Sequence, residues 1–258
     1  MAQQIELGLD TFGDIQAGPD GQVLTHAQVI RNVIDESVLA DEVGVYCIGL
    51  GEHHRPDFAI SSPEVLLGAR GQTRPPLTNQ RIFPPIESGT LKTWIGVGGS
   101  PESVVRAAHY DLPLMLAIIG GDPSRFRPFV DLYHRAFAQF GRPVREIGVH
   151  SHGYVAETDD KAREELWPDY KKMRDRIGAE RGWPPMTRAQ FDSEIEHGSL
   201  YVGAPETVAR RIATTVKALG ISRFHMKYSA GTLSHEKIMC CIELYGRKVI
   251  PLTCDMLA

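Results

Sequence analysis

Glu52, His53 and His54 follow directly after an apolar segment that ends at Leu50. An acid beside two histidines could bind a metal ion, carry a proton in catalysis, or form a hydrogen-bonded corner. The metal interpretation is the weakest here, because consecutive residues of a strand point to opposite faces. His53 can donate or accept a proton near neutral pH, and it lies at the end of a buried strand, where barrel active sites collect. It is our candidate proton carrier, with a hydrogen-bonded corner as the alternative.

A second candidate site is the glycine-rich turn Gly98-Gly99-Ser100, which leads into a predicted helix beginning at Pro101. Its backbone N–H groups, the helix dipole and the hydroxyls of Ser100 and Ser103 suit a phosphate. The turn is neither a Walker A loop nor a dinucleotide fingerprint, because the Lys-Ser/Thr pair and the third glycine are missing. Ser100 could instead simply cap its own helix, although a similar helix start at 203–205 has no serine.

His150 and His152 share one face if their segment is a strand, so a metal site with Asp10 and Glu52 is a further possibility. Such a site would suit a metal-dependent hydrolase. No HExxH run supports it, and we expect a hydrogen-bonded strand end instead, so we assign no metal ligand. A surface or core-polar role is expected for His109, His134, His197, His225 and His235.

Strands and helices alternate around these residues. Strands are predicted to start near residues 5, 45, 93, 114, 147 and 224, with a short additional one at 200–202. Helices are predicted at 25–44, 101–109, 124–140, 159–177, 205–219 and 234–246. Repeated strand–helix units predict a parallel sheet, either a (β/α)8 barrel or an open doubly wound sheet.

The first predicted helix should cover a core. Thr25 and Gln28 have the spacing of a capping box, while Arg31, Asp35 and Glu42 can face water. The apolar face at helical spacing comprises Val29, Ile30, Val33, Ile34 and Val38.

Only six strands are convincing, whereas a closed barrel needs eight. The interval from Gly71 to Lys92 contains four prolines and no helical or alternating pattern. It cannot hold two further strand–helix units. A barrel of this sequence would be shortened there.

Composition excludes several classes of partner. The chain has 258 residues, a net charge of −4 and 42% hydrophobic residues, enough for a large core. The basic residues are scattered, so we expect no nucleic-acid partner. No apolar segment approaches the roughly 20 residues that span a bilayer, so we expect no membrane association and a cytoplasmic location.

Several segments together carry a family resemblance. They are Glu6 to Phe12, Gly49 to His54, Ala59 to Ala69, Trp94 to Ala108 and Leu112 to Gly121. In this order the chain resembles the bacterial-luciferase-like, flavin-dependent monooxygenases, and most of all their uncharacterised oxidoreductases. The resemblance implies a single (β/α)8 barrel domain over 1–258. It also implies FMN at the carboxyl mouth, where reduced flavin and dioxygen attack an organic substrate.

The resemblance also assigns roles to individual residues. His53 falls at the catalytic histidine, and Glu52 falls beside the flavin ring. Gly98, Gly99, Ser100 and Ser103 match positions that hold the FMN phosphate. A deazaflavin could replace FMN, a flavin reductase or NAD(P)H would supply electrons, and a homodimer is expected.

The chain departs from the family pattern after Ala69. About 80 residues of the family pattern are missing there, which corresponds to two strand–helix units of about 30 residues each and an additional helical segment. The segments 1–70 and 71–258 flank this apparent deletion. The two missing strand–helix units would lie between residues 70 and 92. The family's phosphate-binding arginine falls in the missing part, and Arg106 could substitute for it. A non-catalytic flavin-binding protein is therefore the alternative function, ahead of a metal-dependent hydrolase.

Overall fold

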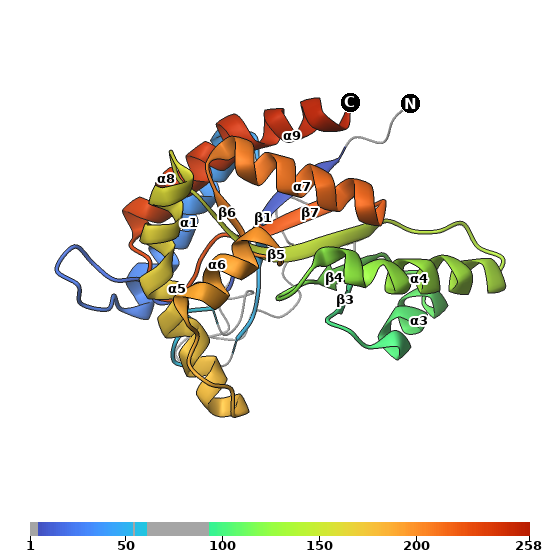
Figure 1. Cartoon of the computed structure of the whole chain (residues 1–258), viewed down its shortest axis with the longest axis horizontal. Helices are drawn as coiled ribbons and strands as arrows, with labels where there is room; N and C mark the ends of the chain where they lie inside the picture. The colour runs from blue at the N-terminus through green and yellow to red at the C-terminus, as the bar shows by residue number, and fades with distance from the viewer. Residues whose placement is uncertain (1–4, 54, 61–92) are drawn as a thin grey trace, which may run out of the picture.

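Parallel strands form one curled sheet in the computed structural model, which describes residues 5–53, 55–60 and 93–258 (Figure 1). The strands are β1 (Glu6–Thr11), β2 (Ile48–Leu50), β3 (Ile95–Val97), β4 (Leu114–Ala117), β5 (Ile147–Val155), β6 (Tyr201–Gly203) and β7 (Arg223–Lys227). Their order is β2-β1-β7-β5-β4-β3, and β6 pairs with the end of β5. Because all pairs are parallel, the carboxyl ends of the strands meet at one edge.

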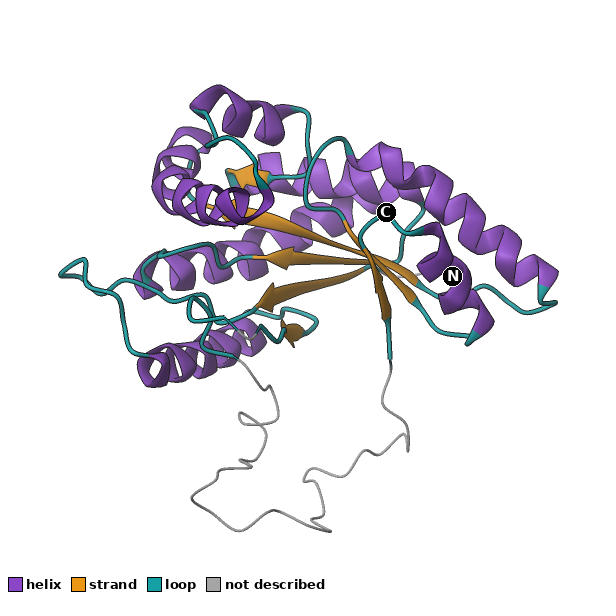
Figure 2. Ribbon diagram, turned by 90° about the horizontal axis from the view of Figure 1, so that it is seen from below, coloured by secondary structure: helices purple, strands orange, loops and turns teal. Residues whose placement is uncertain are grey.

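Helices surround the sheet on its outer side (Figure 2). They are α1 (His26–Glu42), α3 (Pro101–His109), α4 (Arg127–Gln139), α5 (Asp159–Arg181), α6 (Arg188–Glu196), α7 (Pro205–Leu219), α8 (His235–Leu244) and α9 (Ile250–Leu257). A 3-10 turn at Pro123–Phe126 precedes α4, and a π-helical turn at Tyr245–Val249 joins α8 to α9. Neighbouring helices pack against one another in the spatial order α3, α4, α7 and α9, and α8 packs against α1. This is the outer layer of a barrel.

The sheet is an open half-barrel. β2 and β3 are its two ends, and within the described residues they do not pair with each other. This confirms the predicted barrel-type α/β fold with a shortened sheet. The predicted gap between residues 70 and 92 itself lies outside the described residues.

Most predicted elements are present, with corrections at their ends. Helices α3 and α7 have the predicted bounds, whereas β2 begins at Ile48 instead of Val45 and α5 continues to Arg181. The sequence prediction was wrong in missing α6 and α9. The predicted loop around Trp183 is present at residues 182–187, but the prediction placed no helix after it and ended the last helix at about Gly246.

Helix α1 buries a narrower face than its pattern predicted. Val29 and Val33 are buried, but Ile34 and Val38 are 52% and 53% exposed. Glu36 is fully buried in their place, since its carboxylate accepts hydrogen bonds from Gln16 and Tyr228. The capping box is also incomplete: Thr25 accepts from the backbone of Gln28, whose side chain turns to Asn32.

Charged side chains line the concave face of the sheet. In β1 and β7 they alternate with buried apolar residues such as Leu9 and Phe224, which face the helices. Arg223 pairs with Glu6 at the amino end of the sheet, and His225 pairs with Asp10 nearer the carboxyl edge. Gly8 makes room for this layer, because a Cβ there would lie 2.7 Å from Nε2 of His225.

Candidate functional site

The loop at residues 51–60 places His53 at the carboxyl edge, directly after β2. Its backbone N–H donates to the carbonyl of Ile60 at 3.0 Å. The imidazole lies between two aromatic rings, 4.4 Å from Phe12 and stacked 4.6 Å from Phe58. Burial and the charge of Lys227 lower the pKa of His53. His53 is therefore a neutral imidazole at pH 7, able to accept a proton.

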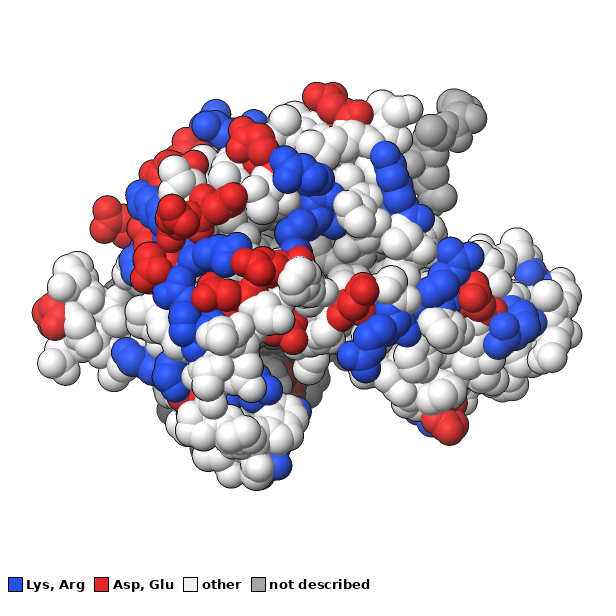
Figure 3. Space-filling view, in the orientation of Figure 1, with Lys and Arg blue, Asp and Glu red and all other residues white. Residues whose placement is uncertain are grey.

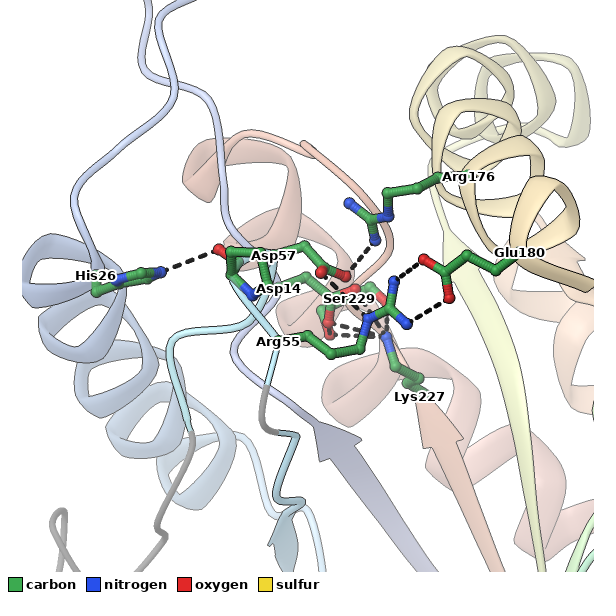
Figure 4. A network of polar contacts seen from close by, with 9 residues as sticks. Asp14, His26, Arg55, Asp57, Arg176, Glu180, Lys227 and Ser229 are labelled. Atoms are coloured by element: carbon green, nitrogen blue, oxygen red, sulfur yellow. Dashed lines mark hydrogen bonds and ion pairs between the residues drawn. The ribbon is translucent and has the colours of Figure 1, made fainter.

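Ion pairs hold this loop against α5 (Figure 4). Arg55 donates to both carboxylate oxygens of Glu180, at 2.7 and 2.6 Å. Arg176, one turn earlier on α5, donates to Asp57. On the other side, the ring of His26 in α1 lies 3.1 Å from the carbonyl of Pro56. The segment that carries His53 is thus fixed between two helices.

A buried ion pair lies beneath the loop (Figure 4). Lys227 and Asp14 are each 3% exposed and are 2.9 Å apart. Nζ of Lys227 also donates to the carbonyl of Ser229, and it lies 5.5 Å from the ring of Phe12. The positively charged Lys227 therefore lies next to Phe12, the aromatic residue that contacts His53.

Glu52 precedes His53 in the loop, and its side chain is exposed. Glu52 therefore lies at the solvent-exposed surface of the loop that carries His53. The position is compatible with a contact to a ligand in the mouth, and the assignment of Glu52 to the flavin ring stays a prediction.

The glycine-rich turn follows β3 at the same edge. Ser100 is the N-cap of α3, and its Oγ accepts from the backbone of Ser103 at 3.2 Å and donates to Glu102 at 2.9 Å. Gly99 has φ of +133°, a conformation that favours glycine. A Cβ at Gly98 or Gly99 would meet no atom of the described residues within 4 Å. The turn is open and polar, and Ser100 does cap its helix.

The related turn at the start of α7 already binds a carboxylate from the chain itself. The backbone N–H of Ala204 donates to Asp159 Oδ1 at 2.7 Å, and Thr207 donates to the other oxygen at 3.1 Å. Gly203 permits this contact, because a Cβ there would lie 2.5 Å from the carboxylate. Among the described residues, no side chain takes the corresponding position at the N–H of Ser100.

His150 and His152 share one face of β5, as the prediction for a strand requires. Nδ1 of His150 lies 2.5 Å from Asp10, whose other oxygen pairs with His225. Nδ1 of His152 is buried and has no hydrogen-bond partner within the described residues. Across the described ranges, no three His, Cys, Asp or Glu side chains are placed to hold a metal ion.

A cavity of about 370 Å³ opens beside the end of β4, between this strand and helices α5 and α6. The surface in Figure 3 is hollowed between the part formed by α5 and α6 and the part formed by α3 and α4. Tyr170 lines the cavity and lies 6.0 Å from the ring of His152. The wall is mixed, and comprises Ile119, Gly120, Tyr170, Arg174, Trp183, Pro184, Met186, Gln190, Ser193 and Glu194. It could hold an organic molecule with both apolar and polar groups.

The two predicted sites are His53 and the glycine-rich turn. Both lie at the carboxyl edge of the sheet, but they follow strands at opposite ends of the strand order. His53 follows β2 and Ser100 follows β3, and no contact joins them in the described part of the chain. Sequence reasoning missed Asp14 and Lys227, which build the charge behind His53. A signal existed for Lys227, which lies in the predicted strand that starts near residue 224, whereas Asp14 lies in the loop after β1.

Comparison with known proteins identifies the family. A family model for luciferase-like monooxygenases matches residues 67–223. The chain belongs to this family. A search of curated proteins finds no match.

Solved structures share the fold at low sequence identity. RslO1, a monooxygenase from Streptomyces bottropensis, is 15% identical with a TM-score of 0.70, covering 96% of this chain and 99% of its own. The oxygenating constituent of 3,6-diketocamphane monooxygenase from Pseudomonas putida, solved with FMN, is 14% identical with a TM-score of 0.68, covering 96% and 98%. An F420-dependent secondary alcohol dehydrogenase is 12% identical with a TM-score of 0.58, covering 97% and 99%.

Proposed function

We propose that this luciferase-like monooxygenase is an FMN-dependent oxidoreductase that acts on an organic substrate with dioxygen. The observation that carries the proposal is the placement of a neutral, aromatic-packed His53 and the open turn at Gly98–Ser103 on one edge of a half-barrel. Barrel enzymes bind and react at this edge. The family match supports the reaction class.

The turn fits a phosphate in its chemistry. The N–H of Ala204 in the related turn binds the carboxylate of Asp159, and this contact supports an oxyanion at the corresponding N–H of Ser100. Ser100 and Ser103 would supply hydroxyls, once Ser100 turns from Glu102. Gly98 and Gly99 leave the approach open. When bound, a reduced flavin supplies the electrons for oxygen activation.

The residues of the chain contribute binding and proton transfer. His53, neutral because of burial and Lys227, accepts or returns a proton at its imidazole nitrogen. Phe12 and Phe58 hold the ring in place. Glu52 is our candidate for a contact beside the flavin ring. Arg106 lies on α3 one turn after Ser103, with its side chain exposed, and could add positive charge near the phosphate.

Structural relatives include an FMN complex and an F420-dependent enzyme, so a deazaflavin is the alternative cofactor. A binding titration distinguishes the two. Purified protein should shift the visible spectrum of FMN on binding, and F420 should compete weakly. Binding of F420 alone would reassign the cofactor, and binding of neither would overturn the proposal.

The phosphate assignment is tested by comparing FMN with riboflavin. Wild-type protein should bind FMN at least about tenfold more tightly, because hydrogen bonds to a charged group are strong. The double variant S100A/S103A should lose this difference. The matched control is Thr214→Ala, whose hydroxyl donates to its own helix at Arg210. Equal FMN affinity in S100A/S103A and wild type would place the phosphate elsewhere.

The second candidate is a flavin-binding protein without catalysis, favoured by the open sheet. It would bind FMN but consume no oxygen beyond free reduced flavin. His53→Ala should slow reduced-flavin turnover by about 10² or more if the enzyme is active. An equally slow rate in wild type and His53→Ala would favour the non-catalytic function.

The expected partners stay predictions. They are a small-molecule substrate, a flavin reductase or NAD(P)H as electron source, and a second copy in a homodimer. Within the described residues, no helix is long and apolar enough to cross a membrane. A cytoplasmic location also stays a prediction.

A further inference from the structure

Asp10 joins two histidines inside the curled sheet. Its Oδ2 lies 2.5 Å from Nδ1 of His150, and its Oδ1 lies 2.9 Å from Nδ1 of His225. The three residues come from the adjacent strands β1, β5 and β7. The proposed roles of His53 and the glycine-rich turn leave this cluster without a function.

The carboxylate of Asp10 determines where His150 carries its proton. Burial alone would raise the pKa of Asp10, but the hydrogen bonds from His150 and His225 outweigh it and hold the pKa well below its usual range. An ionised carboxylate can only accept hydrogen bonds. Nδ1 of His150 must therefore be the protonated nitrogen, and in the neutral ring Nε2 is left as the acceptor.

His225 supplies the charge that balances Asp10. Burial lowers the pKa of His225, but the hydrogen bonds to Asp10 and to Cys47, 3.3 Å from Nε2, outweigh it and raise the pKa to about 9. At pH 7 the pair of Asp10 and His225 is therefore neutral as a whole.

The surroundings of His150 leave the second nitrogen open. Its side chain is 16% exposed, and no hydrogen bond to Nε2 is present among the described residues. Phe12 presents its ring 6.4 Å away, on the side that leads to His53. The titratable groups that face His150 are Asp10 from β1, His225 and Lys227 from β7, and His152 on its own strand. Lys227 is already paired with Asp14.

We propose that Nε2 of His150 is a second proton acceptor at the mouth, oriented by Asp10 as a positioning residue, and that it takes a hydroxyl proton from the bound organic substrate. The O–H bond breaks, an N–H bond forms at Nε2, and the electron pair stays on the substrate oxygen. Nδ1–H remains bonded to Asp10, which stabilises the imidazolium. The substrate step rests on the proposed function, whereas the Asp10–His150 pair does not.

Nitrogen-15 NMR of the imidazole rings tests the pair in the full chain without any cofactor. The signals of His150 are assigned by their loss in His150→Gln. We expect a protonated Nδ1 and an unprotonated Nε2 in the neutral ring. A protonated Nε2 in the wild-type protein would overturn the proposal. Asp10→Asn should weaken the preference for this tautomer, and the wild-type spectrum decides the question if that variant does not fold.

Acylation by diethyl pyrocarbonate, which attacks unprotonated imidazole nitrogens, tests access to Nε2. Peptide mapping should find the modification on Nε2 of His150, at least about tenfold slower after saturation with FMN and 1-butanol. His197, whose side chain is 80% exposed, is the matched control and should react equally in both samples. An unmodified His150 beside a fully modified His197 would contradict an accessible acceptor.

Turnover separates this proposal from the one on which it rests. In His150→Gln, kcat should fall by about 10² to 10⁴, while the Kd for FMN changes less than about threefold. Unchanged kcat in a protein that binds FMN would overturn the role of His150 alone. If wild-type protein binds no flavin, the proposed function fails. The tautomer and acylation results still show whether Asp10 orients His150 and whether Nε2 is accessible.

Discussion

Lys227 carries a full charge in the interior, and its surroundings explain how the fold tolerates it. Nζ donates to both oxygens of Asp14, at 3.1 and 2.9 Å, and to the carbonyl and hydroxyl of Ser229. Removing two charges from water is costly, and the cost is offset only when the hydrogen bonds are complete. The fixed charge then lowers the pKa of both His53 and His152, after burial. Burial and the charge of Lys227 thus act in the same direction on both imidazoles, and both favour the neutral ring.

Replacing Lys227 with Met tests the pair, because Met retains much of the volume and none of the charge. Asp14 would lose its counter-ion in the interior, and the free energy of unfolding should fall by about 3–5 kcal/mol, measured by urea denaturation at pH 7. The matched control is Arg127→Ala, which breaks a pair whose members are 56% and 46% exposed, and it should leave stability unchanged. A Lys227→Met protein as stable as wild type would contradict a buried, charged Asp14.

At the scale of elements, α5 connects two regions of the mouth. Its first residue, Asp159, binds the N-terminus of α7, and its last turns hold the loop of His53 through Arg176 and Glu180. Between these ends it packs Tyr170 against Phe191 of α6. The position of His53 therefore depends on a helix far from it in sequence.

Weakening the contacts of α5 should free the His53 loop without unfolding the protein. In the double variant Asp57→Asn/Glu180→Gln we expect the amide of His53, which donates to Ile60, to exchange hydrogen at least about tenfold faster. Hydrogen exchange followed by mass spectrometry measures this. Glu164→Gln, which breaks a different α5 ion pair with Arg188, is the control and should not affect the loop. Unchanged protection in the double variant would mean that other contacts hold the loop.

The carboxylate of Asp159 should stabilise the start of α7 as a capping residue does. Asp159→Ala removes the acceptor of two hydrogen bonds, and we expect a loss of about 1 kcal/mol in the free energy of unfolding. Asp160→Ala is the matched control, because Asp160 also lies in the first turn of α5. Thermal denaturation compares the two. Equal melting temperatures would show that Asp159 contributes only through the dipole of its own helix.

At the scale of the whole molecule, the charged layer inside the sheet should govern how stability depends on pH. His225 has a pKa of about 9 in the folded protein and about 6.5 when unfolded. Its protonation therefore stabilises the fold fully below pH 6.5, and this contribution is lost as the pH rises through 9.

We expect the free energy of unfolding to fall by up to about 3 kcal/mol between pH 6.5 and 10 because of His225. Denaturant titrations across this range measure it. His225→Gln should reduce the slope, whereas His197→Gln, at an exposed position, should not. The same slope in His225→Gln and wild type would refute the raised pKa.

The overall architecture follows from patterns that are local in sequence. Alternating strands and helices predicted the barrel-type sheet, and Pro101 and Pro205 marked two helix starts correctly. Helix α6 had a usable signal as well, since Thr187 and Gln190 form the complete capping box that Thr25 and Gln28 do not. The difference arises because buried Asn32 competes for the side chain of Gln28.

The interior of the site depends on strand register, which a single sequence does not reveal. His225 was expected to be an ordinary surface or core-polar histidine, yet pairing of β7 with β1 and β5 brings it to Asp10 and His150. The positions of His53 and Ser100 at the carboxyl edge could be predicted, because each directly follows a strand. Their assigned roles stay predictions.

Helix α5 also sets a constraint on length. Its 23 residues span about 35 Å at 1.5 Å per residue, and each added residue turns the following part by about 100°. A single inserted residue near Pro168 would rotate Arg176 and Glu180 away from Arg55 and Asp57, even if no side chain in the mouth were changed. Seven added residues would restore the direction but shift both groups by about 10 Å. The number of residues in this helix is thus as much a part of the site as the identity of His53.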